Sequence, residues 1–454
     1  MIRNIKWDNH KVLGNLELDF TKADGTPYNT IVLAGENGTG KTQILETIGE
    51  FLDLGTFEPF DKIDYMVDSE IYVLSKINRE NAKYGFHKRL KVNANEILAI
   101  HRGRNNDEEG IQADKKDIRS YGFAYSKARS GFKTEKVYSA TTQQLDLNKY
   151  ENDSKDDFTN IKQLLVDIDT QDNSEWMRIT VNNVGINFDE FRKASKKFRF
   201  EKAFNSFFET IKFVGIDNNS IEEKRLIFKK YDKEFTVDDL STGEKQIVFR
   251  GAGLLRNVNG IIGGVVLIDE PELSMHPKWQ QKILQYYRNL FTINGVQNVQ
   301  MIFATHSEYV IKAALEDKDN VLIITLSDDN GCVVANKMLT PMVLQALTAG
   351  EINYLAFGIL SVDYHIALYG YLQSKYGLDS IRACDTYIEN RSPIYQRNIH
   401  EKIDNYVNSN GKTTVYKTLP TYIRNYIDHP DGNRQPYTES ELEESIKLLI
   451  ELCR

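Results

Sequence analysis

Four short segments, far apart along the chain, contain residue types that can bind and cleave a nucleoside triphosphate. They are Gly35–Thr42, Leu240–Glu244, Leu267–Pro271 and Thr305–Ser307. The first reads Gly-Glu-Asn-Gly-Thr-Gly-Lys-Thr, a spacing in which glycines let backbone N–H groups turn toward phosphate oxygens. We therefore predict that ATP binds at this segment. A glycine-rich turn without a ligand is the alternative.

Individual side chains of the first segment have separate predicted roles. We expect Lys41 to bridge the β- and γ-phosphates and the Thr42 hydroxyl to bind Mg²⁺. The other residues expected to surround the nucleotide are Gly35, Asn37, Gly38, Gly40 and Gln43.

An acidic pair, Asp269 and Glu270, ends the apolar run that begins at Gly264 and reads as a buried parallel strand. Because neighbouring strand residues point to opposite sides, Asp269 can hold Mg²⁺ while Glu270 polarises the attacking water. His306 follows the next apolar run, Val299–Ala304, and is predicted to contact the γ-phosphate. A lone histidine is more often an ordinary surface or core residue, and its position after a strand favours the catalytic interpretation.

Ser241, Gly243 and Glu244 belong to a segment that opens a predicted helix. Free N–H groups at a helix start attract anions. Because the chain already has a phosphate loop, we expect this segment to contact ATP held by a second copy. ATP would then join two protomers, and hydrolysis would separate them. The alternative is a simple capping box, in which Ser241 and Glu244 satisfy the helix start.

These segments must be positioned by a small number of domains. Residues 1–60 and 236–339 are predicted to form one α/β ATPase head, because helical and strand-like segments alternate between 240 and 326. Residues 61–235 are polar and weakly patterned, and are predicted to form a compact inserted lobe of mixed or helical structure. Half of the chain's 24 tyrosines lie between Tyr354 and Tyr437, and residues 340–454 are predicted to form a mostly helical C-terminal domain.

The composition limits the classes of function. A formal net charge of −8 argues against a protein that coats nucleic acid through bulk positive charge. The basic run Arg192–Lys202 suits a phosphate-gripping surface or, better, the polar face of an amphipathic helix. No apolar run is long enough to span a membrane, and the start lacks a secretory signal. Cys332, Cys384 and Cys453 have no metal-ligand spacing and are predicted to be reduced thiols in the cytoplasm.

Together the four segments resemble the ATP-binding cassette fold, in the branch that contains SMC, the Rad50-type repair ATPases and the RecF- and OLD-like ATPases of phage defence. Asp269–Pro277 is very similar to the Asp-Glu-Pro-Glu-x-x-Leu-His-Pro run of the defence group, with Met275 replacing leucine. The resemblance implies that Ser274–His276 cross a dimer interface. It also implies a glutamine that contacts Mg²⁺, for which Gln143 and Gln144 are the candidates.

The C-terminal region resembles that of the Septu anti-phage ATPase family, PtuA, whose relatives also occur with retrons. The residues that carry this resemblance are Glu351–Phe357, Tyr364–His365 and Leu368–Leu372. The resemblance implies a partner, a separately encoded HNH nuclease bound by the C-terminal domain, with DNA or RNA as the target of the complex.

A second motif in the C-terminal region competes with this interpretation. Arg424 and His429 form Arg-x-x-x-x-His, similar to the active motif of HEPN ribonucleases, where arginine binds the scissile phosphate and histidine transfers a proton. An intact ribonuclease site is one interpretation. A structural remnant, with both residues buried in a helix pair or docking interface, is the favoured one.

We therefore expect an α/β fold in which a cassette-type ATPase head carries an inserted lobe and a helical C-terminal domain. The expected function is that of an ATP-hydrolysing subunit, acting as a dimer or higher assembly, that controls a nuclease subunit in phage defence. One alternative is a DNA-repair clamp with ATP-dependent DNA binding. Another is an ATP-gated ribonuclease toxin that uses Arg424 and His429. The Asp269–Pro277 run disfavours a transporter motor.

Overall fold

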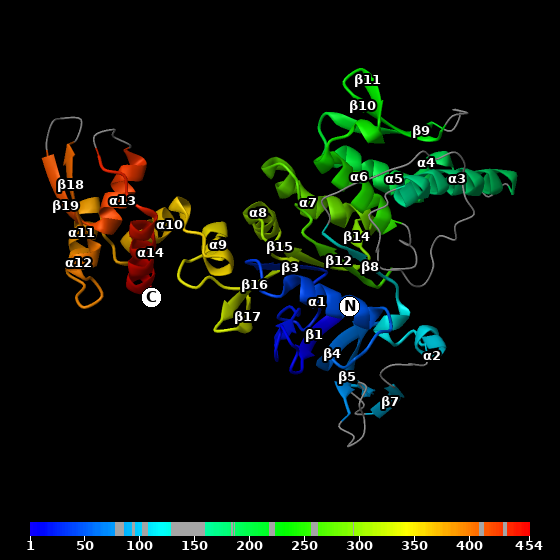
Figure 1. Ribbon diagram of the computed structural model, residues 1–454, viewed down its shortest axis with the longest axis horizontal. Helices are drawn as coiled ribbons and strands as arrows, with labels where there is room; N and C mark the ends of the chain where they lie inside the picture. The colour runs from blue at the N-terminus through cyan, green and yellow to red at the C-terminus, as the bar shows by residue number, and fades with distance from the viewer. Residues whose placement is uncertain are drawn as a thin grey trace. The chain divides into compact units, whose positions relative to one another are not determined.

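The computed structural model describes residues 1–77, 86–92, 96–101, 108–128, 159–182, 185, 187–217, 223–255, 262–293, 295–407, 413–429 and 434–454. They form two compact units, Met1–Lys337 and Met338–Arg454 (Figure 1). Each unit has its own cluster of buried hydrophobic residues.

The first unit is built around a six-stranded sheet with the strand order β17-β16-β3-β15-β12-β8. Its strands are β3 (Thr30–Gly35), β8 (Phe123–Ser126), β12 (Val265–Asp269), β15 (Gln300–Thr305), β16 (Val321–Asp329) and β17 (Cys332–Lys337). Neighbours run parallel except in the β16–β17 hairpin. β3, β12 and β15 are buried at every residue, as their apolar sequences require of parallel strands covered on both faces.

Helices alternate with strands of this sheet along the chain, as predicted. They are α1 (Lys41–Leu52), α6 (Thr242–Leu255), α7 (Pro277–Leu290) and α8 (Glu308–Glu316). α7 begins at Pro277, where the missing N–H costs no helical hydrogen bond. A short hairpin, β13 (Thr292–Ile293) with β14 (Val296–Gln297), interrupts the alternation and was not predicted. Because β3, β12 and β15 are parallel, their carboxyl ends meet at one edge of the sheet.

A second six-stranded sheet of the first unit has the order β2-β1-β4-β5-β6-β7 and is antiparallel. Its strands are β1 (Ile2–Trp7), β2 (Glu17–Asp19), β4 (Phe60–Val67), β5 (Glu70–Lys76), β6 (His87–Lys91) and β7 (Glu96–His101). The structure therefore differs from the expected lobe boundary at residue 61. β4 pairs with β1 and β8 pairs with β12, so both complete the head. These partners are distant in sequence, which is why local patterning did not reveal them.

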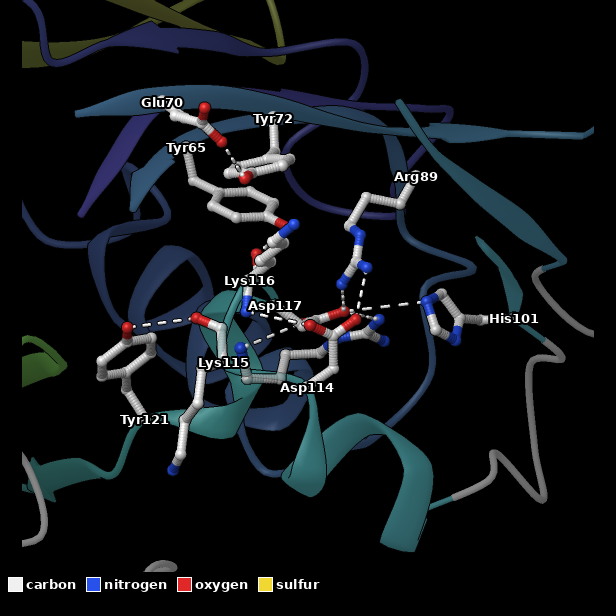
Figure 2. A network of polar contacts seen from close by, with 11 residues as sticks. Tyr65, Glu70, Tyr72, Arg89, His101, Asp114, Lys115, Lys116, Asp117 and Tyr121 are labelled. Carbon is white, nitrogen blue, oxygen red and sulfur yellow. Dashed lines mark hydrogen bonds and ion pairs between the residues drawn. The ribbon is translucent and has the colours of Figure 1, made fainter. Parts of the chain in front are cut away.

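A buried ionic network fastens the segment after β7 to this antiparallel sheet (Figure 2). The segment contains α2 (Glu108–Ala113) and the 3₁₀ turn η1 (Ile118–Ser120). Fully buried Asp117 caps η1, and its Oδ2 accepts from Arg119 Nη2 at 2.8 Å and from Arg89 Nη1 at 3.4 Å. Burial alone would raise the pKa of Asp117, but the two guanidinium groups hold it below its usual value. Arg89 also pairs with Asp114, so this part of the network holds two charges of each sign.

The rest of the inserted segment forms a lobe of helices and a small sheet. Its elements are α3 (Thr159–Val181), α4 (Phe188–Ala194), α5 (Lys196–Phe207), β9 (Ile211–Asp217), β10 (Arg225–Lys230), β11 (Lys233–Thr236) and the 3₁₀ turn η2 (Val237–Asp239). In the basic run of this lobe, Arg192 pairs with Glu201 and Lys197 with Asp169, while Arg199 is buried. These contacts favour the amphipathic-helix interpretation of the run.

The second unit is mainly helical, as expected, but also contains a hairpin. Its elements are α9 (Ala349–Phe357), α10 (Val362–Lys375), α11 (Ile381–Glu389), α12 (Arg397–His400), β18 (Glu401–Val407), β19 (Thr413–Thr418), α13 (Leu419–Asp428) and α14 (Glu439–Cys453). The paired strands β18 and β19 were not predicted. No single helix among the described residues has the length and apolar character needed to cross a membrane. One bent pair, α9 with α10, passes that test by length and composition only.

A fully buried histidine in this unit predicts a pH-dependent stability. The Nε2 atom of His365, on α10, lies 2.9 Å from Ser445 Oγ on α14, and burial lowers the pKa of His365 to about 3. An unfolded histidine titrates near pH 6.5, so the unfolded chain binds more protons between these values. The contribution to the free energy of unfolding is complete above about pH 6.5 and falls below it, by up to about 1.4 kcal/mol per pH unit. Urea unfolding between pH 7.5 and 5 measures this slope.

The variant that checks this assignment is His365→Gln. We expect its free energy of unfolding to depend less on pH than that of the wild type, by about one proton. A wild-type slope in His365→Gln would contradict the prediction.

Candidate nucleotide-binding site

The predicted phosphate loop connects the end of β3 to the start of α1. Lys41 is 7% exposed, and its Nζ donates to the carbonyl oxygens of Gly35 (2.6 Å) and Glu36 (2.8 Å). Burial lowers the pKa of Lys41, and nearby carboxylates oppose that shift. Gly40 has φ +82°, and a Cβ there would lie 2.6 Å from Leu13 Cδ2. The loop therefore requires glycine at this position for both conformation and space.

The remaining predicted residues of this loop have different environments. Asn37 and Gly38 are exposed at its tip, and Gly38 has φ +89°. Gln43, on the first turn of α1, donates from Nε2 to Glu46 Oε2 at 2.7 Å. The tip of the loop is therefore accessible to solvent, whereas the Gln43 side chain is bonded to Glu46 on the same helix.

Thr42 and Asp269 come from distant parts of the sequence and meet at the edge of the central sheet. Thr42 Oγ1 donates to Asp269 Oδ2 at 2.9 Å. Asp269 is 4% exposed, and its buried Oδ1 has no hydrogen-bond partner among the described residues. Burial raises the pKa of Asp269, whereas the Thr42 hydrogen bond and the Lys41 charge lower it. A hydroxyl beside an unpartnered carboxylate oxygen is a donor set that fits Mg²⁺, which prefers oxygen ligands.

Glu270 and His306 lie next to each other beyond the ends of β12 and β15. Glu270 Oε1 is 3.6 Å from His306 Nδ1, and both side chains are partly exposed. Glu270 has φ +44°, a left-handed conformation that costs a non-glycine residue about 1–3 kcal/mol. The backbone therefore leaves the strand geometry at Glu270. The alternation of a continuous strand, on which we based the separation of Asp269 from Glu270, does not extend that far.

Glu272 is a site residue whose role the sequence analysis missed. It is 4% exposed, and its Oε1 accepts from Thr305 Oγ1 at 2.6 Å and from the His306 backbone N–H at 3.1 Å. Glu272 thereby ties the end of β15 to the acidic turn after β12. Its place in the Asp269–Pro277 run was the available signal, but only the fold shows which atoms it contacts.

The segment at the start of α6 forms the capping box that we considered as an alternative. Ser241 N–H donates to Glu244 Oε2 at 2.7 Å, and Glu244 N–H donates to Ser241 Oγ at 3.4 Å. Ser241 itself is exposed. A Cβ at Gly243 would lie 2.9 Å from Ser274 O, so glycine allows the helix start to approach the turn before α7. Ser274 is exposed and has φ +61°.

Three apolar side chains beside the phosphate loop were also missed. Leu13, Val12 and Val333 surround the position that a Cβ at Gly40 would occupy, at 2.6, 3.7 and 3.7 Å. They come from the turn after β1 and from β17, so no local sequence signal could have grouped them. The candidate glutamines Gln143 and Gln144 lie outside the described residues.

The Arg-x-x-x-x-His motif occupies the end of α13 in the second unit. Arg424 pairs with Asp428 at 2.6 Å and donates from Nη1 to Asn425 Oδ1 at 3.1 Å. His429 is exposed, rather than buried as the favoured interpretation expected. The arginine charge is thus engaged by a carboxylate one helical turn away.

Residues 31–312 match a protein family described as "AAA domain, putative AbiEii toxin, Type IV TA system". The match includes the phosphate loop, the acidic pair and His306, and covers more than half of the chain. The chain belongs to this family. Its α/β fold, with a parallel central sheet in the first unit, agrees with the predicted fold class.

Relatives of this AAA-family chain include two Septu PtuA proteins and a retron ATPase. Septu protein PtuA of Bacillus mycoides (strain KBAB4) is 25% identical over 335 residues, which cover 71% of this chain and 40% of that protein. PtuA of Bacillus thuringiensis is 22% identical over 327 residues, 69% of this chain and 74% of that protein. The "Retron Vc95 probable ATPase" of Vibrio cholerae serotype O1 biovar El Tor is 33% identical over 102 residues, 20% of this chain and 19% of that protein. The predicted resemblance to the Septu ATPases is confirmed, although the chain spans less than half the length of the first and third of these relatives.

Solved structures similar to this chain include SMC heads. A head bound to the C-winged helix domain of ScpA gives a TM-score of 0.39 at 11% identity, covering 74% of this chain and 98% of that one. The head from Thermotoga maritima gives 0.34 at 15% identity, covering 74% and 98%. Both TM-scores are too low to establish a shared fold.

Proposed function

We propose that this chain is an ATP-hydrolysing subunit of an anti-phage defence complex. The main support for the proposal is the contact between Thr42 and Asp269. It joins the phosphate loop, which also holds Lys41, to the end of β12. Family membership supports the ATPase activity. The similarity to PtuA and to the retron ATPases supports the role in defence.

Binding of the triphosphate uses groups that are already in place. Lys41 would exchange the carbonyl oxygens of Gly35 and Glu36 for β- and γ-phosphate oxygens, which satisfy its charge better than carbonyls do. Thr42 and Asp269 would hold Mg²⁺, which neutralises charge on those phosphates when bound. Val12, exposed beside Gly40, would cover a face of the nucleotide's base.

Hydrolysis requires a group that takes the proton of the attacking water. Glu270 is proposed for this role, because it is partly exposed and lies directly beyond the Mg²⁺-holding residue. His306, beside Glu270, would contact the γ-phosphate. Glu272 would keep His306 in place through the hydrogen bond to its backbone N–H.

We further propose that the start of α6 contacts ATP bound to a second copy. Ser241 is exposed there, and among the described residues its hydroxyl accepts one long hydrogen bond, 3.4 Å, from the Glu244 N–H. That bond is easily exchanged for one to a phosphate oxygen. Ser274, exposed beside Gly243, would lie at the same interface.

The second unit is proposed to bind a separately encoded HNH nuclease. A hollow of about 610 Å³ on α11 supports a docking role, since it is lined by Arg382, Tyr387 and Arg391 and by no carboxylate. The Arg391 guanidinium lies 4.0 Å from the Tyr387 ring centroid. Cations beside aromatic rings suit an acidic segment of a partner protein.

The purified chain, incubated alone with plasmid DNA and total RNA, tests where the nuclease resides. With Mg-ATP we expect ATP hydrolysis, and with or without it we expect no cleavage of either substrate, because Arg424 is paired with Asp428. Gel electrophoresis of both substrates, beside a phosphate-release assay, measures this. RNA cleavage that disappears in His429→Ala would instead place a ribonuclease in this chain. ATP-dependent DNA binding without cleavage, weakened steeply by salt, would favour the repair-clamp alternative.

A further inference from the structure

We propose that Arg250, on α6, is a positioning residue that holds the backbone of Glu270 and connects it to the helix start at Ser241. The inference rests on the proposed ATPase function and assigns a role that the sequence motifs do not suggest. Arg250 lies in the interior of α6, nine residues beyond Ser241, in a stretch that reads only as an amphipathic helix.

Arg250 is 5% exposed, and its guanidinium group makes four hydrogen bonds to described residues at the end of the sheet. Nη2 donates to the Asp269 carbonyl at 2.6 Å, and Nη1 donates to the Glu270 carbonyl at 2.8 Å. Nε donates to Ser126 Oγ at 2.8 Å, and Nη2 also donates to the Ser126 carbonyl at 3.0 Å. One side chain therefore holds the acidic turn after β12 and the end of β8 together.

The carbonyl groups of Ser126, Asp269 and Glu270 need a side-chain donor because the pairing between β8 and β12 ends at this point. The last residue pair between β12 and β8 is Ile268 with Ser126. Beyond it the chain turns into the left-handed conformation at Glu270, whose N–H still donates to Ala304 O at 2.9 Å. Without Arg250 the carbonyls of Ser126, Asp269 and Glu270 lose this donor, and the turn that aims the Glu270 carboxylate can relax.

The geometry requires arginine rather than positive charge alone. A guanidinium offers five N–H donors in a rigid planar fork, whereas an ammonium group offers three donors from a single point. A lysine at this position could reach one or two of the four acceptors but could not span β8 and β12 at once.

Arg250 also links the acidic turn to the proposed interface between protomers. About 1.5 Å of helical rise per residue places it roughly 13 Å along α6 from Ser241. The helix between them is held against α7, where Tyr286 Oη donates to Ile247 O at 2.6 Å. Packing is so close that a Cβ at Gly251 would lie 1.9 Å from Tyr286 Oη. A small shift of α6 when Ser241 meets a second ATP would therefore reach Glu270 through Arg250.

Steady-state hydrolysis by Arg250→Lys tests the inference. We expect kcat to fall by about tenfold or more, while KM for ATP changes by less than about twofold. The matched control is Arg288→Lys on α7, whose guanidinium pairs with Asp317 at 2.6 Å and lies outside the site. It should keep the wild-type kcat. Urea unfolding of both variants checks that any loss of activity is not a loss of folding.

Chemical rescue gives a readout that a merely structural role would not move. Arg250→Ala leaves a space shaped for guanidinium, so millimolar guanidinium should restore part of kcat, while sodium at equal ionic strength should not. Wild-type kcat in Arg250→Lys would overturn the inference, as would a loss confined to KM or a failure of rescue in folded Arg250→Ala. Absence of hydrolysis by the wild type itself would instead refute the proposed function.

Discussion

Glu270→Gln should lower the rate of ATP hydrolysis by about a hundredfold or more, because an amide cannot accept a proton from the attacking water. Glutamine keeps nearly the same shape, and neither Asp269 nor Lys41 depends on the Glu270 carboxylate for a hydrogen bond. Nucleotide binding should therefore survive, and ATP-joined dimers should accumulate because they no longer separate. Phosphate release measures the rate, and size-exclusion chromatography with Mg-ATP measures the dimer.

The control for this substitution is Glu316→Gln, which removes an exposed carboxylate at the end of α8. It should hydrolyse ATP at the wild-type rate and form dimers only transiently. Hydrolysis by Glu270→Gln at the wild-type rate would show that another group takes the proton. Slow hydrolysis without dimer accumulation would retain the role of Glu270 but remove the proposed second-copy contact of Ser241.

Lys41→Ala should abolish nucleotide binding. The buried ammonium group lies against the carbonyls of Gly35 and Glu36 in the phosphate loop, and alanine leaves the β- and γ-phosphates without this charge. A ligand that binds only the folded state stabilises it by about 2.7 kcal/mol at a hundred times Kd. Mg-ATP should therefore raise the melting temperature of the wild type and leave that of Lys41→Ala unchanged.

The control for Lys41 is Lys62→Ala, which removes a half-exposed lysine paired with Asp64 on β4. Mg-ATP should raise its melting temperature as in the wild type. Because Lys41 also bonds two loop carbonyls, the two variants are first compared without nucleotide. An ATP-dependent shift in Lys41→Ala equal to that of the wild type would refute the nucleotide site.

Much of the nucleotide site could be predicted because its chemistry lies in contiguous runs of sequence. A phosphate loop needs glycines at fixed positions, and Gly40 shows why, since its backbone is left-handed and a Cβ would strike Leu13. Asp269 ends one strand and His306 follows another, and both strands are mostly apolar. Parallel strands bring their carboxyl ends to one edge, so the residues that end them had to be neighbours.

The inserted segment was harder to predict because its order comes from long-range pairing. The sequence of β4 contains as many polar residues as that of an edge strand. Only its pairing with β1 places it in the ATPase head. Asp117 stands in a charged stretch of sequence, which predicts an exposed side chain. In the structure it is fully buried. Arg119, two residues further along the chain, and Arg89, on β6, neutralise it, and Arg89 becomes its neighbour only when the sheet forms.

By itself the sequence determined the family, the α/β class and the residues that meet at the phosphate loop, because local geometry and strand ends dictate these. Tertiary structure alone decided what surrounds them. Glu272 became a support for His306, Leu13 and Val333 became neighbours of Gly40, and Arg250 became the donor to the acidic turn. Each of these contacts joins elements far apart in the chain, and a hydrogen bond or packing contact across such a distance leaves no periodicity in the sequence.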